Sequence, residues 1–186
     1  MEENLTQEQS LIKRIVICGP ESTGKSTLTK NLSDYFKTNY VDEFARDFLQ
    51  QKWNNKHEAC TQEDLIEIAR GQIELENLKI KNSTKSIFCD TNILTTIAWS
   101  KTHFSGYCDP WLERQAKVLK YDYYLILNTD IPWIKDDLRD SPNDREKMFI
   151  AHKLELDNLN VNYNIIDGSD FKKRFNLAVE FIKNIY

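Results

Sequence analysis

The segment Gly19-Pro-Glu-Ser-Thr-Gly24-Lys25-Ser26 constrains this chain more than any other, because it matches the pattern G-x-x-x-x-G-K-[ST] in full. It follows a short β-branched run, Arg14–Cys18, and precedes apolar residues at helical spacing. A phosphate-binding loop (P-loop) requires this order, because its backbone N–H groups and the positive end of the following helix face an anion. The alternative is a strand-to-helix turn that contains glycine and binds nothing.

Each part of the loop has an expected task in binding ATP and Mg²⁺. Lys25 would reach the β- and γ-phosphates, Ser26 would hold Mg²⁺, and Thr27 would contact the α-phosphate. Gly168, in the Asp167-Gly168 turn, would approach the adenine, although a plain turn explains that glycine equally well. The residues predicted to bind the nucleotide are Gly19, Glu21, Ser22, Thr23, Gly24, Lys25, Ser26, Thr27 and Gly168.

Strand-like and helix-like segments alternate along the chain. This alternation predicts an α/β fold of the P-loop NTPase and nucleoside-kinase type, with about five parallel strands and helices on both faces. We expect a polar extension over residues 1–12, one domain over 13–186, and a lid over about 131–146. The predicted strands are Arg14–Cys18, Tyr40–Asp42, Ser86–Cys89, Tyr123–Leu127 and Asn162–Ile166. The predicted helices start at Lys25 and near Phe44 and Asp64, cover Ile93–Phe104, Pro110–Lys120 and Asp144–Leu159, and end the chain from Phe171.

Polar residues follow the predicted strands at the point where each one ends. In a parallel sheet these ends meet at one edge, which is where ligands bind in such folds. The sequence therefore predicts a shared active site at that edge. The residues concerned are Gly19, Asp42, Glu43, Asp90, Asn128 and Asp167.

Two other classes of P-loop protein fit the sequence poorly. A GTPase needs a guanine-reading Asn-Lys-x-Asp motif after a strand, whereas the fourth strand ends in Asn128-Thr129-Asp130-Ile131. A mechanical ATPase of the AAA type needs more than 186 residues and an arginine facing a neighbouring subunit, which we do not identify. A small-molecule kinase fits the size, and it needs an acid near the acceptor hydroxyl and arginines near the transferred phosphoryl group.

Three carboxylates are candidates for the acid and for the metal site. Asp42 and Glu43 end the second strand, so either would contact the acceptor and orient its hydroxyl. Asp90 ends the third strand, where a carboxylate typically contacts Mg²⁺ or its water shell. The alternative for each is a capping residue of the helix that follows.

The predicted lid supplies the arginines, and a tryptophan supplies an aromatic wall. Arg139 and Arg145 flank Ser141-Pro142 and would clamp phosphates; the alternative is a solvated loop with surface ion pairs. An aromatic face suits a nucleobase or a pyridinium ring, so we expect one of the four tryptophans to contact the acceptor and take Trp99 as the candidate. The alternative for each tryptophan is a place in the core.

Composition excludes several partners. The chain has 25 basic and 29 acidic residues, a net charge of −4, so we expect no nucleic-acid partner. No apolar run reaches the roughly 20 residues of a membrane span, and the amino terminus is not a signal peptide, so we expect a cytoplasmic protein. Cys18 and Cys89 read as small core residues, and we expect no disulfide or metal site from any cysteine. The oligomeric state stays open.

Several blocks together resemble the ribosylnicotinamide kinase domain of the NadR-type NAD-salvage proteins. The similarity runs over roughly residues 14–178 and includes the P-loop. The other blocks are Glu43-Phe-Ala-Arg46 with Asp47-Phe48, Ala69-Arg-Gly-Gln72, Cys89-Asp90-Thr91-Asn92, Trp133-Ile-Lys-Asp-Asp137-Leu-Arg139 and Arg145. The resemblance implies phosphorylation of the 5′-hydroxyl of nicotinamide riboside by ATP. It also implies that Glu43, rather than Asp42, and Arg46 belong to the acceptor pocket, that Asp90 belongs to the metal or ribose shell, and that Arg139 and Arg145 belong to the lid.

Two departures from that family matter. The bifunctional members carry a separate adenylyltransferase domain and usually a DNA-binding segment, and we expect neither activity from these 186 residues. The family's lid glycine is Asp137 here. Two alternatives therefore remain: a kinase for another nucleoside or small metabolite, and a nucleotide-gated binding module with little turnover.

Overall fold

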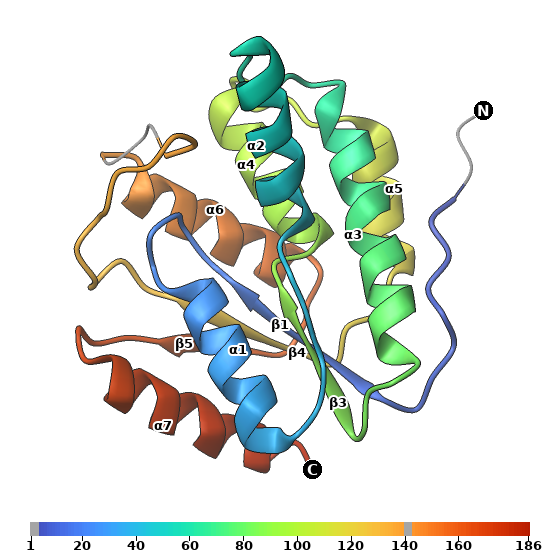
Figure 1. Ribbon diagram of the computed structural model, residues 1–186, viewed down its shortest axis with the longest axis vertical. Coiled ribbons are helices and arrows are strands. Elements are labelled where there is room, and N and C mark those ends of the chain that lie inside the picture. Colours follow the sequence, from blue (N-terminus) through green and yellow to red (C-terminus); the bar gives the residue numbers. More distant parts are fainter. Residues whose placement is uncertain (1–3, 140–142) are drawn as a thin grey trace.

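The computed structural model has a five-stranded parallel sheet in the order β2-β3-β1-β4-β5 (Figure 1). All four strand pairs are parallel, which confirms the predicted fold class. The structure describes residues 4–139 and 143–186, so the Ser141-Pro142 part of the predicted lid lies outside the described residues. The strands are β1 (Lys13–Cys18), β2 (Tyr40–Val41), β3 (Ser86–Asp90), β4 (Tyr123–Leu127) and β5 (Tyr163–Ile166).

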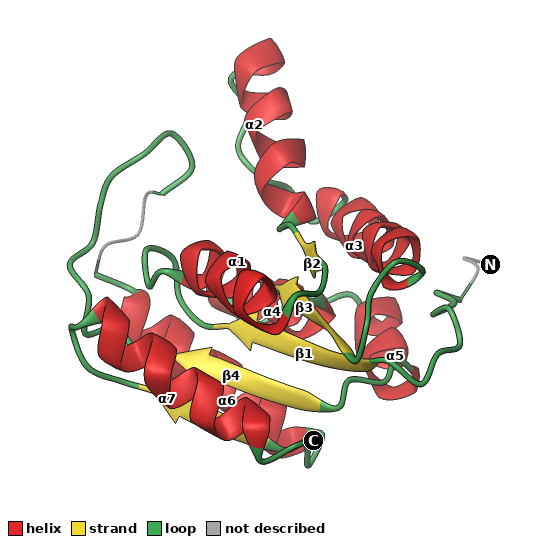
Figure 2. Ribbon diagram, turned by 60° about the horizontal axis from the view of Figure 1, so that its bottom comes forward, coloured by secondary structure: helices red, strands yellow, loops and turns green. Residues whose placement is uncertain are grey.

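Helices cover both faces of the sheet (Figures 1 and 2). Two of them, α1 (Lys25–Phe36) and α7 (Phe171–Lys183), pack on one face. The other face is covered by α3 (Asp64–Ile80), α4 (Ile93–His103), α5 (Pro110–Val118) and α6 (Arg145–Asn158). Helix α2 (Phe44–Lys56) has no fully buried residue and projects from the sheet edge, as Figure 2 shows.

The alternation of side chains along each strand divides the core into two clusters. Val16 and Cys18 of β1 point to the side of α3 and α4, while Ile15 and Ile17 point to α1 and α7. Cys18 and Cys89 are both buried, as predicted. Among the described residues, no helix is both long enough and apolar enough to cross a bilayer.

The predicted elements are confirmed, with ends that shift by one or two residues. One apolar residue used to identify the last helix lies elsewhere than expected: Phe171 is 53% exposed, whereas Arg174 on the same helix is 2% exposed. Phe171 occupies the first turn of α7 and lies above the backbone of Gly24, where a Cβ would come within 2.9 Å of its ring. Its position on the P-loop explains why it does not enter the core.

A buried polar cluster joins β1 to α3 on the far side of the sheet from α1. The Glu76 carboxylate is fully buried and accepts a hydrogen bond from the Tyr121 hydroxyl at 3.0 Å. Arg14 Nε lies 3.9 Å from the other carboxylate oxygen. Burial raises the pKa of Glu76 to about 7, against the opposing effects of Tyr121 and Arg14. The folded state therefore disfavours the charged form of Glu76.

We expect this group to make stability fall as the pH rises. Its pKa in the folded state lies above its unfolded value of about 4.3. The protein is therefore most stable, as far as Glu76 is concerned, below the unfolded value, and loses stability until the pH passes about 7. In Glu76→Gln this loss is absent. The free energy of unfolding of wild type relative to Glu76→Gln should fall by roughly 3 kcal/mol between pH 4 and pH 8. Denaturant titrations at both pH values measure it.

The matched control is Glu74→Gln, which changes an exposed carboxylate on the same helix. It should show the same pH dependence as wild type. A difference between wild type and Glu76→Gln that stays constant with pH would contradict the shifted titration of Glu76.

Candidate active site

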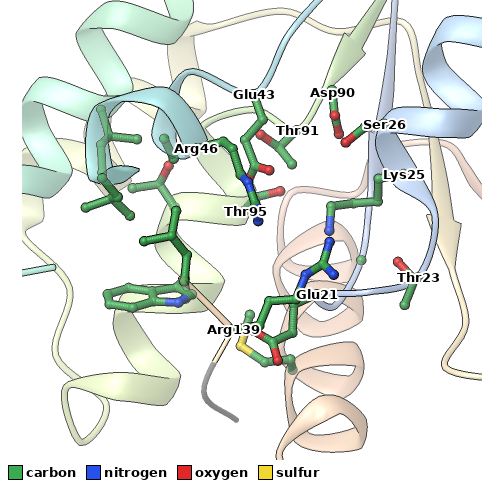
Figure 3. A pocket seen from close by; sticks show the side chains of 18 of the residues that line it. Glu21, Thr23, Lys25, Ser26, Glu43, Arg46, Asp90, Thr91, Thr95 and Arg139 are labelled. Atoms are coloured by element: carbon green, nitrogen blue, oxygen red, sulfur yellow. The ribbon is translucent and has the colours of Figure 1, made fainter. Parts of the chain in front are cut away.

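A cavity of about 410 Å³ opens at the carboxyl edge of the sheet. Its wall combines the P-loop with residues from α2, α3, α4, α6 and the segment before α6. Figure 3 shows the P-loop side chains on one side of it and Glu43, Arg46 and Thr95 on the other. Residues predicted for the site that line the cavity are Gly19, Glu21, Ser22, Thr23, Gly24, Lys25, Ser26, Thr27, Asp42, Glu43, Arg46, Asp90, Trp99, Arg139 and Arg145.

The P-loop connects β1 directly to α1. Gly19 has a φ of 128°, and a Cβ there would lie 2.6 Å from the Leu127 carbonyl oxygen, so only glycine fits beside β4. The loop is closed by bonds from the Thr23 hydroxyl and the Lys25 ammonium to the Pro20 carbonyl, each 2.8 Å. No side chain caps the start of α1. Its first N–H groups are therefore available to an anion.

Asp90 is the last residue of β3, and it is 3% exposed. Burial raises its pKa to about 7, and the charge of Glu43 acts in the same direction, against the lowering effects of Lys25 and the Ser26 hydroxyl. Figure 3 shows Asp90 beside Ser26. Its Oδ1 atom is buried and has no hydrogen-bond partner among the described residues. A buried oxygen without a partner is costly unless a ligand satisfies it.

The alternative that Asp90 caps a helix does not hold. The capping residue of α4 is Asn92, whose side chain accepts a hydrogen bond from the Leu94 amide at 3.1 Å. Asp90 is thus left free of a structural task at the helix start, and its carboxylate faces the P-loop.

Glu43 also turns out not to cap its helix. It stands at the N-cap position of α2, yet its side chain makes no capping bond. The Phe44 amide instead donates to Gln72 Oε1 of α3 at 2.9 Å, and Gln72 Nε2 donates to the Asp42 carbonyl at 3.4 Å. Gln72 therefore holds the turn between β2 and α2 and leaves the Glu43 carboxylate in the cavity wall. Asp42 also lines the cavity, but it is more exposed than Glu43.

The neighbouring glycine of α3 brings α2 close. A Cβ on Gly71 would lie 2.2 Å from the Phe44 ring, so a larger residue would displace α2. Gly71 thus positions α2 through packing, and Gln72 does so through its amide side chain. The sequence analysis singled out residues 69–72, but it could not predict their partners, which are almost 30 residues away in the chain.

Trp99 of α4 forms part of the cavity wall. Its ring stacks on that of His103, with the ring centres 4.1 Å apart and an angle of 11° between the planes. Trp111 is buried under Arg70, and Trp133 donates its indole N–H to Glu21 at 2.5 Å. Of the four tryptophans, Trp99 is the one among the residues lining the cavity.

The segment before α6 lies against the P-loop. The Ile134 amide donates to the Ser22 hydroxyl at 2.9 Å, and Arg145 Nη2 donates to the Ser22 carbonyl at 3.4 Å. Arg145 is 8% exposed, and burial lowers the pKa of its guanidinium. Its Nε atom has no partner among the described residues. Arg145 is therefore a buried residue in contact with the P-loop, and the alternative of a solvated surface loop does not hold for it.

The structure separates Gly168 from the cavity and adds a residue that sequence reasoning missed. Gly168 donates its amide to Asp130 Oδ2 at 2.7 Å and does not line the cavity. Arg174 joins that turn to the P-loop, since it donates to the carbonyls of Gly168, Thr23 and Asn128. In the sequence, the one indication of this role is that Arg174 is a charged residue on the apolar side of its helix.

Comparisons with known proteins identify relatives of this chain in sequence and in fold. The "Trifunctional NAD biosynthesis/regulator protein NadR" of Escherichia coli (strain K12) is 27% identical over 176 residues, which are 94% of this chain and 43% of that protein. The protein of the same name from Salmonella typhimurium has the same identity and coverage. This chain therefore spans less than half the length of these curated relatives.

Solved structures agree on the fold. A crystal structure of NadR in complex with NR matches with a TM-score of 0.78 and 18% identity, covering 94% of this chain and 52% of that one. Thymidylate kinase from Ehrlichia chaffeensis matches with a TM-score of 0.61 and 13% identity, covering 91% and 98%. These likenesses establish a P-loop kinase fold.

A family model described as an AAA domain matches residues 14–174, which is most of the chain. That description names a domain and no reaction, so the expectation against a mechanical ATPase stays a prediction. The chain is homologous to NadR, and it belongs to the AAA domain family of P-loop proteins.

Proposed function

We propose that this protein is an ATP- and Mg²⁺-dependent kinase of a small nucleoside-like acceptor, with nicotinamide riboside as the leading candidate. The observation that carries the proposal is the meeting of Lys25, Ser26, Glu43 and Asp90 in one cavity. Phosphoryl transfer needs mainly positioning and charge stabilisation, and this set supplies both.

The nucleotide would bind along residues 19–27. The amides at the start of α1 would surround the phosphates, and Lys25 would exchange its bond to the Pro20 carbonyl for the β- and γ-phosphates. The base would extend towards the turn at Gly168, which Arg174 ties to the P-loop. ATP is the nucleotide we expect.

The residues present fit a bound Mg²⁺. Asp90 offers a buried oxygen that no described residue hydrogen-bonds, and the Ser26 hydroxyl lies beside it. The described residues contain no group of three or more His, Cys, Asp or Glu at a possible metal site. Mg²⁺ does not require one, because it usually takes one or two protein ligands together with phosphates and waters. When bound there, Mg²⁺ would neutralise charge on the phosphates.

Glu43 would act on the acceptor. Its carboxylate would accept a hydrogen bond from the acceptor hydroxyl and orient it towards the γ-phosphorus. In the reaction, the hydroxyl oxygen forms a bond to that phosphorus, the bond to the oxygen of ADP breaks, and the hydroxyl proton passes to Glu43. Arg139 and Arg145 would stabilise charge on the transferred group.

Two observations support nicotinamide riboside. The stacked rings of Trp99 and His103 both line the cavity, and an aromatic ring such as that of Trp99 can attract a positively charged ring. A NadR protein with a similar fold has been crystallised in complex with NR. The fold is shared with kinases of other acceptors, such as the deoxyadenosine kinase of M. mycoides, so a kinase for another nucleoside is the first alternative. A binding module with little turnover is the second.

A panel of acceptors tests the assignment. Purified protein with ATP and Mg²⁺ should release ADP in proportion to nicotinamide riboside consumed, and the product should be nicotinamide mononucleotide by mass. Product from another nucleoside alone would move the acceptor to the first alternative. ATP binding with no acceptor-stimulated ADP release would favour the binding module.

Removing the P-loop ammonium should slow phosphoryl transfer strongly without unfolding the protein. In Lys25→Ala we expect kcat/KM to fall on the order of 10²–10³-fold, because one group that stabilises the transferred charge is lost. The thermal midpoint should stay close to that of wild type. Lys30→Ala, an exposed residue on the same helix, is the matched control and should keep full activity.

Substitutions that remove one charge at a time should distinguish the role of Glu43 from that of Asp42. Glu43→Gln keeps the shape of the side chain but cannot accept the proton, so kcat should fall at least about 10²-fold. Asp42→Asn should lower kcat much less, because that side chain is more exposed. Steady-state kinetics with saturating ATP measure both, and a larger loss in Asp42→Asn would reverse the assignment.

A further inference from the structure

A single carboxylate lies between the arginine of α2 and the arginine of the segment before α6. Asp136 Oδ2 is 2.6 Å from Arg46 Nη2 and 3.1 Å from Arg139 Nε. Arg46 and Arg139 both line the cavity, whereas Asp136 is not among the residues that line it. The two arginines come from parts of the chain that are 93 residues apart in sequence, and Asp136 is their shared partner.

The turn around Asp136 fixes the arginine that follows it. Asp136 Oδ1 accepts the Leu138 amide at 3.0 Å, and Arg139 Nη1 donates to the Ile134 carbonyl at 3.0 Å. Arg139 is thus held through Nε and through Nη1. One turn further along α2, Gln50 donates to Asp137 at 3.3 Å. The turn therefore contacts α2 through two neighbouring carboxylates. Among the described residues, Asp136 is the one of the two that contacts arginines of the cavity wall.

The charges explain why a carboxylate is needed there. Two guanidinium groups in one cavity wall repel each other unless an anion lies between them. Burial acts to raise the pKa of Asp136, but the hydrogen bonds from Arg46 and the Leu138 amide outweigh it and lower that pKa. Asp136 is thus a carboxylate at neutral pH.

Stability does not explain this arrangement. The side chains of Arg46, Asp136 and Arg139 are 40%, 25% and 27% exposed, and ion pairs of that kind contribute little to folding. Loss of the Asp136 charge should therefore change where the arginines point more than it changes the free energy of unfolding.

We propose that Asp136 is a positioning residue that holds Arg46 towards the acceptor and Arg139 towards the transferred phosphoryl group. The inference rests on the proposed kinase function. It assigns a role to Asp136, one of the two aspartates in the segment Trp133–Arg139. It also links the acceptor pocket to the segment that carries Arg139. An acceptor that contacts Arg46 would thereby act on the arginine that stabilises the reaction.

Asp136→Asn tests this role, because it keeps the size of the side chain and removes its charge. We expect kcat for the acceptor phosphorylation to fall on the order of 10-fold or more, and KM for the acceptor to rise, because both arginines lose their orientation. The affinity for ATP and the thermal midpoint should stay near wild type. Asp136→Glu should recover part of the rate. Asp137→Asn, the adjacent carboxylate, is the matched control and should stay within about twofold of wild type.

A double-mutant cycle separates positioning from an unspecific effect. In an Arg139→Ala background, Asp136→Asn should cost much less than it does in wild type, because the group that it positions is gone. Equal losses in both backgrounds, or a loss that follows the thermal midpoint, would overturn the proposal.

An NMR measurement keeps this test independent of the reaction. The Arg139 Nε–H signal should shift and exchange faster with solvent in Asp136→Asn than in wild type or Asp137→Asn. An unchanged signal would refute the positioning role even in an active kinase. If the signal changes but no acceptor in the panel is phosphorylated by wild type, the proposed function fails while the contact between Asp136 and Arg139 stands.

Discussion

The pairing of β1 with β3 is the contact on which the site depends. Ile17 lies opposite Asp90 in the sheet, and the Thr91 amide donates to the Ile17 carbonyl at 2.9 Å. Because the strands are parallel, the chain leaves both of them at the same edge. The P-loop therefore starts beside Asp90, and the lysine and the carboxylate that would share a nucleotide come from segments about 65 residues apart in sequence.

Packing between helices adds the acceptor side. Helix α2 extends from the sheet edge with little burial of its own, so its place depends on α3. Gly71 allows the Phe44 ring to come close, and Gln72 takes over the capping of α2. The same two residues that stabilise the junction thereby leave Glu43 unused by the helix and directed to the cavity.

Charge balance connects these parts. The Glu43 and Asp90 carboxylates lie in the same cavity, where two negative charges repel each other. Burial, together with the charge of Glu43, raises the pKa of Asp90 to about 7. Lys25 opposes this effect from the P-loop side. Asp136 lies between two arginines of the cavity wall and balances their positive charges. The site thus combines carboxylates with positively charged side chains, which suits a reaction that moves a highly charged phosphoryl group.

The sequence by itself determined the P-loop, the five strands, most helix ends and the edge at which the polar residues gather, because these depend on local patterns of a few residues. The domain limits and the lid over residues 131–146 stay predictions. Only the tertiary structure decided that Asn92 and Gln72, rather than Asp90 and Glu43, serve the helix starts. It also revealed Arg174 behind the P-loop and Asp136 between two arginines. These roles depend on contacts between residues that are distant in the chain, and no local periodicity encodes such contacts.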